Sequence, residues 1–151
     1  MIQETPNADE RWMRLALDEA RQALSRGEVP IGAVVVCRGR LIARGHNLTQ
    51  TLNDVTAHAE MQAITAAAAT LGGKYPTECT LYVTVEPCLM CAGALAWSQI
   101  TRIVYGADDP KRGYHTFTRR PFHPRTTVTS GVLAHECAQL LTSFFAGRRQ
   151  K

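Results

Sequence analysis

The sequence lacks a cationic start followed by an apolar run at its N-terminus, MIQETPNADE, so no secretory signal is expected. It also lacks a membrane-length hydrophobic run. The uncharged stretch from Met61 to Gly73 is rich in alanine and threonine and is well short of a membrane span. These absences argue against secretion and membrane insertion and favour a cytoplasmic location.

The chain also lacks an even number of cysteines: it has five, and it has no signal for export. A disulfide framework is therefore a poor interpretation. Cys37 and Cys79 lie in strand-like apolar runs, and Cys137 lies in a late helical pattern. We expect these three to be small buried hydrophobic residues. Cys88 and Cys91 form a C-x-x-C pair and need a separate explanation.

Composition and charge describe an ordinary globular chain with an uneven distribution of charge. The 151 residues are 45% hydrophobic and 20% charged, which fits one domain over residues 1–151. Residues 1–101 carry eight basic and ten acidic side chains, a net −2, whereas residues 102–151 carry nine basic and three acidic ones, a net +6. This asymmetry fits an anionic partner such as nucleic acid, and equally a solvated basic tail.

Local patterns predict alternating helices and strands. Asn7 and Glu10 match a capping box, an apolar stripe with helical spacing follows, and Gly27 fits a helix stop. The other predicted elements are strands over 31–36, 41–43, 80–85, 102–105 and 126–129, and helices over 57–71, 88–97 and 132–146. Residues 46–56 and 106–125 are predicted to be loops. The strand–helix–strand order over 80–105 implies a right-handed parallel crossover.

Two short fragments carry the chemistry, His58-Ala59-Glu60 and Pro87-Cys88-Leu89-Met90-Cys91. Positions i and i+3 share a helix face, so both sulfurs can point at one site. Both cysteines are expected in the first helical turn, where the helix dipole favours thiolate. His58 also falls near a helix start. If the two helix starts meet, they supply one nitrogen and two sulfur ligands.

Three protein ligands and one open position are typical of a catalytic zinc site, and imidazole with a thiolate pair suits zinc. Zinc lowers the pKa of water in that position towards about 7. Glu60 lies about 200° around a regular helix from His58, so it is not expected to bind the same ion. A carboxylate beside the metal can instead move protons.

Each fragment alone is a weak signal, since redox pairs and half-sites of zinc ribbons share C-x-x-C, and surface glutamates are common. A thioredoxin-like redox pair would leave His58 and Glu60 without a role. Together and in this order, the fragments match the signature of zinc-dependent base deaminases.

The sequence resembles the bacterial tRNA adenosine deaminases of the cytidine-deaminase superfamily over nearly its whole length. The resemblance rests on these segments: GEVPIGAV (27–34), GHN (45–47), TAHAE (56–60), TLYVTVEPC (80–88), MCAGA (90–94), VYGA (104–107), GVL (131–133) and FF (144–145). It implies an α/β, three-layer fold with a five-stranded mixed sheet and helices on both faces. It also implies conversion of the wobble adenosine of certain tRNAs to inosine by a zinc enzyme that is usually a homodimer.

The resemblance assigns roles position by position. His58, Cys88 and Cys91 match the zinc ligands, and Glu60 matches the proton shuttle. Asn47 matches an asparagine that hydrogen-bonds the nucleoside. Val29 matches a pocket-wall residue, with core packing as the alternative, and Ala59 a main-chain contact to the base.

The chain departs from the family at two places. Val55 follows Asp54 where the family usually has proline. The segment 114–125, YHTFTRRPFHPR, replaces a stretch of small residues that contacts RNA in the family. Aromatic rings interleaved with arginines can hold unpaired bases, or the rings can instead cover the core or a dimer contact. Two alternatives therefore stay open, a deaminase of a free base or nucleoside (guanine, cytosine or cytidine) and a catalytically silent RNA-binding subunit.

Overall fold

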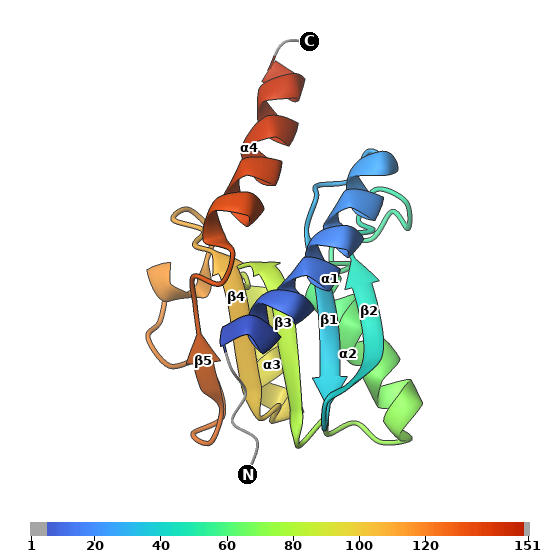
Figure 1. Cartoon of the computed structure of the whole chain (residues 1–151), viewed down its shortest axis with the longest axis vertical. Helices are drawn as coiled ribbons and strands as arrows, with labels where there is room; N and C mark the ends of the chain where they lie inside the picture. The colour runs from blue at the N-terminus through green and yellow to red at the C-terminus, as the bar shows by residue number, and fades with distance from the viewer. Residues whose placement is uncertain (1–5, 150–151) are drawn as a thin grey trace.

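The computed structural model describes residues 6–149 and contains a mixed five-stranded sheet, which confirms the predicted α/β class. The strands are β1 (Gly32–Cys37), β2 (Arg40–His46), β3 (Cys79–Val85), β4 (Arg102–Ala107) and β5 (Thr127–Thr129). Their order is β2-β1-β3-β4-β5 (Figure 1). Strand β1 pairs antiparallel with β2 and β3, whereas β3–β4 and β4–β5 are parallel pairs.

Helices cover both faces of the sheet. They are α1 (Pro6–Ser25), α2 (Ala59–Leu71), α3 (Leu89–Ser98) and α4 (Ala134–Arg149), with a short 3-10 helix, η1, over Tyr114–Thr116. One buried cluster packs α1 and the start of α4 against the sheet, and the other packs α2 and α3 on the opposite face (Figure 1). Among the helices described, none combines the length and the apolar character that a membrane crossing needs.

Two glycines bring α1 and α2 into direct contact with the sheet. A Cβ atom on Gly32 would lie 2.1 Å from the Ala16 carbonyl oxygen of α1. A Cβ atom on Gly45 would lie 2.7 Å from the carbonyl oxygen of Ala59 at the start of α2. No side chain fits between these backbones, so the glycines fix how closely each helix approaches. The start of α2 is thereby held against β2.

One edge of the sheet gathers four chain segments. Gly32 at the start of β1 pairs with His46 at the end of β2, and its amide donates to the Thr84 hydroxyl near the end of β3. Val85 at the end of β3 in turn pairs with Ala107 at the end of β4. The loops that follow β2, β3 and β4, and the segment before β1, therefore meet at this edge.

Several local predictions need correction. Helix α1 begins at Pro6, so Asn7 lies inside the helix and is not its cap. Helix α3 begins at Leu89, and Cys88 is its N-cap in an extended conformation instead of a first-turn residue. Cys79 and Cys137 are buried as expected, but Cys37 is only half-buried.

Candidate metal centre and active site

His58, Cys88 and Cys91 converge at this edge of the sheet. His58 is the N-cap of α2, Cys88 is the N-cap of α3, and Cys91 lies in the first turn of α3. The His58 Nδ1 atom lies 3.6 Å from the Cys88 sulfur and 3.4 Å from the Cys91 sulfur. The three candidate ligand atoms all lie within 4.8 Å of one another. The structure therefore brings the predicted ligand set together.

The chemistry of this donor set fits zinc. Tetrahedral bonds of about 2.3 Å to sulfur and about 2.0 Å to nitrogen separate the donors by about 3.5 Å, close to the observed separations. A hydrogen bond from the Cys91 thiol, together with the contact to His58, lowers the pKa of Cys88 to about 4 despite burial. Cys88 therefore carries thiolate, the form that binds metal.

Glu60 lies beside the three candidate ligands and is buried, with 4% of its surface exposed. It is the second residue of α2, two positions after His58. Burial raises the pKa of the Glu60 carboxyl to about 7, an effect that its contacts with His58 and Cys91 offset only in part. A carboxyl group in this range can hold or release a proton near neutral pH.

The sequence-predicted substrate residues line one pocket with His58 and Cys88 of the metal-capable group. The pocket has a volume of about 450 Å³, and Val29, Asn47 and Ala59 contribute to its wall together with Glu60. Within residues 6–149, the Asn47 side-chain oxygen is buried without a hydrogen-bond partner. An unsatisfied acceptor in a pocket wall is suited to bind a ligand N–H group.

Sequence reasoning missed several other residues in the pocket lining. These are Ile31, Thr49, Val85, Glu86, Asp109, Arg112 and Phe145. They come from segments far apart in the chain, so no local pattern marks them as a group. Ile31, Val85, Glu86 and Phe145 do lie in segments that carry the family resemblance, and that is the one signal that could have identified them.

A buried carboxylate braces the pocket loop that follows β2. Glu28 is fully buried and accepts hydrogen bonds from the Gln50 amide, 3.0 Å, and from the amide and hydroxyl of Thr51, 2.6 and 2.7 Å. Burial raises the pKa of Glu28, but these hydrogen bonds outweigh it and hold the pKa below the usual value. Glu28 thus fixes the backbone next to Thr49, a pocket residue.

Comparison with known proteins decides the family. The family described as MafB19-like deaminase matches residues 7–149. A tRNA-specific adenosine deaminase of Bacillus subtilis (strain 168) is 45% identical, over 95% of this chain and 92% of the relative. A tRNA-specific adenosine deaminase of Agrobacterium fabrum is 48% identical, over 91% and 94% respectively. The chain belongs to the tRNA-specific adenosine deaminase family.

Solved structures agree with this membership. A structure from a study of A-to-I editing by tRNA:A34 deaminases at the wobble position has a TM-score of 0.81 and 48% identity, over 87% of this deaminase and 99% of the other chain. A guanine deaminase from Nitrosomonas europaea has a TM-score of 0.79 and 27% identity, over 97% and 87%. The fold is therefore that of a deaminase, and within it His58, Cys88 and Cys91 form a metal-capable group.

The segment that departs from the family is divided between core and surface in this deaminase. Tyr114 is buried and packs edge-on against Phe122, with ring centroids 4.9 Å apart. Phe117 and the two arginines Arg119 and Arg120 are exposed. Two of the three rings therefore take the structural role, and the exposed ring and arginines remain free to contact a partner.

Proposed function

We propose that this chain, acting as one deaminase domain, hydrolyses adenosine at the wobble position of tRNA to inosine and ammonia. One observation carries the proposal: a buried carboxyl group, Glu60, shares a pocket with His58 and Cys88, which form a metal-capable group with Cys91. Relatives at 45–48% identity named tRNA-specific adenosine deaminase support RNA adenosine as the substrate.

In this proposal the Nδ1 atom of His58 and the sulfurs of Cys88 and Cys91 would hold Zn²⁺. When bound, zinc supplies a Lewis acid that makes hydroxide available near neutral pH. The short distances from His58 Nδ1 to the two sulfurs and the thiolate character of Cys88 support this assignment. A catalytically silent subunit would need no buried carboxyl group beside the ligands, so Glu60 favours an enzyme.

Glu60 carries out the proton transfers. Its carboxylate takes a proton from the attacking water and delivers it to N1 of the adenine ring, while the water oxygen adds to C6. Glu60 then transfers the remaining hydroxyl proton to the amino group at C6. That group leaves as ammonia, and the product keeps a carbonyl at C6 and a proton on N1.

The pocket wall holds the adenosine in place for this reaction. The buried side-chain oxygen of Asn47 accepts a hydrogen bond from the nucleoside, and Val29 packs against the base. The main chain at Ala59 contacts the base from the start of α2. Phe145, an exposed ring that also lines the pocket, offers a stacking surface to an unpaired base.

We further assign a cytoplasmic homodimer. The cytoplasm is where a tRNA substrate would be met. The apolar side chains Leu89, Met90 and Trp97 are exposed on α3, and Trp97 is 85% exposed. Together with the family resemblance, these three side chains on one helix support pairing of two copies through α3, since apolar surface that is covered by a partner is removed from water.

The deciding experiment compares two substrate classes. Purified protein loaded with zinc is incubated with an anticodon stem-loop that carries adenosine at the wobble position, and inosine is measured by mass spectrometry. Ammonia release is measured in parallel from free adenosine, guanine, cytosine and cytidine. We expect inosine in the stem-loop and little ammonia from the free compounds. Activity confined to a free base would contradict the tRNA assignment and favour the alternative.

A further inference from the structure

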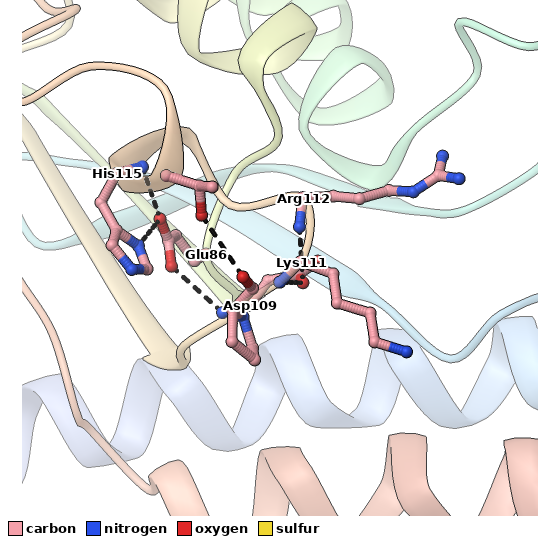
Figure 2. A network of polar contacts seen from close by, with 7 residues as sticks. Glu86, Asp109, Lys111, Arg112 and His115 are labelled. Carbon is pink, nitrogen blue, oxygen red and sulfur yellow. Dashed lines mark hydrogen bonds and ion pairs between the residues drawn. The ribbon is translucent and has the colours of Figure 1, made fainter.

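Glu86 is a second buried carboxylate at the pocket, and the proposed chemistry gives it no role. It follows β3 directly and lies two residues before Cys88. Its side chain is 0% exposed. One carboxylate oxygen accepts the Asp109 amide at 3.1 Å, and the other accepts the His115 amide at 3.0 Å and the His115 ring Nδ1–H. Figure 2 shows these bonds converging on Glu86 from the loop that follows β4.

The same loop also contacts the metal-ligand segment through its backbone. Gly113 forms an isolated antiparallel bridge with Cys88, and the Tyr114 amide donates to the Pro87 carbonyl at 2.9 Å. A Cβ atom on Gly113 would lie 2.3–2.4 Å from the carboxylate atoms of Glu86. The loop backbone is therefore in direct contact with both the carboxylate and the ligand segment.

These contacts fix a turn that displays positive charge. The side-chain oxygen Oδ1 of Asp109 accepts the amides of Lys111 and Arg112 at 3.1 and 3.0 Å. Arg112 is exposed and also lines the pocket. In Figure 2 the Arg112 side chain extends away from the Glu86 carboxylate. A guanidinium group held at a pocket rim is suited to pair with a phosphate.

We propose that Glu86 is a positioning residue for RNA binding. By fastening the loop 109–115 to the metal-ligand segment, Glu86 holds the Arg112 guanidinium at the pocket rim, where it contacts a backbone phosphate of the RNA substrate. This inference rests on the proposed function for its RNA partner. Glu86 acts through the loop and not on the base, because its oxygens accept hydrogen bonds from the loop.

The first test measures the loop without RNA. In Glu86→Gln, the side-chain NH₂ group faces backbone donors, so at least one set of hydrogen bonds is lost. We expect faster amide hydrogen exchange at Asp109, Gly113 and His115, and an unchanged zinc content. Glu10→Gln, an exposed change on α1, serves as the matched control. Unchanged exchange in the loop of Glu86→Gln would overturn the fastening role.

A second variant covers the case in which Glu86→Gln folds poorly or loses zinc. His115→Ala removes one donor from a half-exposed side chain and leaves Glu86 in place. We expect amide exchange in the loop to be faster than in the unsubstituted protein. If His115→Ala leaves exchange unchanged while folding and zinc content match the unsubstituted protein, the fastening role is wrong.

The second test asks whether the effect of Glu86→Gln on RNA binding depends on Arg112. Dissociation constants for the anticodon stem-loop are compared among the unsubstituted protein, Glu86→Gln, Arg112→Ala and the double variant. Arg112→Ala should weaken binding about tenfold and reduce the salt slope by about 1. Glu86→Gln should have a similar effect alone and add nothing to Arg112→Ala. For the stem-loop substrate, KM should rise in both single variants while kcat stays nearly unchanged.

Additive effects of the two changes, or a fall in kcat with an unchanged KM, would overturn the positioning role. Failure of the proposed function has a different signature. In that case the unsubstituted protein itself makes no inosine and binds the stem-loop no better than an unrelated RNA. The RNA part of the inference then falls, and the exchange measurement alone decides whether Glu86 fastens the loop.

Discussion

At the scale of single residues, the burial of Glu60 is the feature that governs the chemistry. A carboxyl group with 4% of its surface exposed exchanges few protons directly with solvent. It lies next to three candidate metal ligands and opens onto the pocket. Any proton that Glu60 gives or takes during the reaction therefore goes to or from a group inside the pocket.

Replacing Glu60 by glutamine tests this role. Glu60→Gln keeps the size of the side chain, but the amide cannot shuttle protons. We therefore expect kcat for inosine formation to fall by about 10²–10⁴-fold. Zinc content, measured by plasma mass spectrometry, should stay the same. Glu10→Gln, the exposed matched control, should keep full activity. A Glu60→Gln protein that still turns over at the original rate would remove Glu60 from the mechanism.

At the scale of elements, the contact between β2 and α2 determines where His58 and Glu60 lie. Gly45 allows the two backbones to touch, because a Cβ atom there would lie 2.7 Å from both the Ala59 oxygen and the Ala63 nitrogen. These are backbone atoms, which cannot move aside like the end of a flexible side chain. The position of the start of α2 therefore depends on a glycine in a neighbouring strand.

Gly45→Ala should lower stability and activity together. Overpacking of this kind costs about 1–3 kcal/mol of unfolding free energy, and it should also displace the start of α2. Urea denaturation measures the first effect, and kcat/KM on the stem-loop measures the second. Gly147→Ala, in open space on α4, is the matched control and should be neutral or slightly stabilising. An unaltered denaturation midpoint for Gly45→Ala would contradict the packing argument.

The sequence predicted most elements because their patterns are local. The β-branched runs of β1 and β3 and the alanine-rich α2 were all placed within a few residues of their observed bounds. The capping box at Asn7 was wrong, since Pro6 is itself a suitable first helical residue. Cys88 was placed one residue too far into its helix, because Pro87 lies before the N-cap, Cys88, and does not take the first helical position.

The candidate site was predicted only where a motif carries it. His58, Cys88 and Cys91 stand in short fragments with a known spacing, and the structure brings them together. Glu86, Arg112 and the loop around them depend on tertiary contacts between chain segments more than twenty residues apart. The arginines singled out in the sequence, Arg119 and Arg120, are exposed but are not in the pocket lining, whereas Arg112 is.

At the scale of the whole molecule, one polar cluster joins distant parts of the chain. Asp9 on α1 accepts two hydrogen bonds from the Arg102 guanidinium of β4, both 2.8 Å, and one from the Tyr82 hydroxyl of β3, 2.8 Å. Burial raises the pKa of Asp9, but the bonds from Arg102 and Tyr82 outweigh it and lower the pKa below 3.8. The cluster therefore contributes to stability while Asp9 is ionised.

This depressed pKa gives a defined pH dependence. Since the folded pKa lies below the unfolded value of 3.8, the contribution is complete above about pH 4 and is lost as the pH falls through the folded pKa. Asp9→Asn should lower the unfolding free energy at pH 7 by about 2 kcal/mol. The difference from the unsubstituted protein should shrink below pH 4. Urea denaturation at pH 7, 5 and 3 measures it.

Asp18→Asn is the control for that experiment, because Asp18 lies on the same helix and is 58% exposed. Loss of the Asp18 carboxylate should change the unfolding free energy by less than about 0.5 kcal/mol at each pH. If Asp9→Asn and Asp18→Asn behave alike, Asp9 does not anchor α1 to the sheet.

Pairing of two copies through α3 is also a property of the whole molecule. Trp97→Lys puts a charge at the most exposed of the three apolar side chains on α3. We expect the dissociation constant of the dimer to rise about tenfold or more, because aromatic residues dominate interface energies. Sedimentation velocity across a concentration series measures it. Val128→Lys, an exposed apolar change on β5, should leave the dimer intact. A Trp97→Lys protein that dimerises as before would place the interface elsewhere.

The separation of the metal-capable ligands along the chain has a consequence beyond catalysis. His58 and Cys88 are 30 residues apart, and each is the cap of a different helix. An ion bound to both closes a chain segment as a covalent staple would, and the entropy removed from the unfolded state is worth about 3.6 kcal/mol by the loop-closure relation. A cell short of this ion would therefore hold a chain that is easier to unfold and to degrade, as well as one that is inactive.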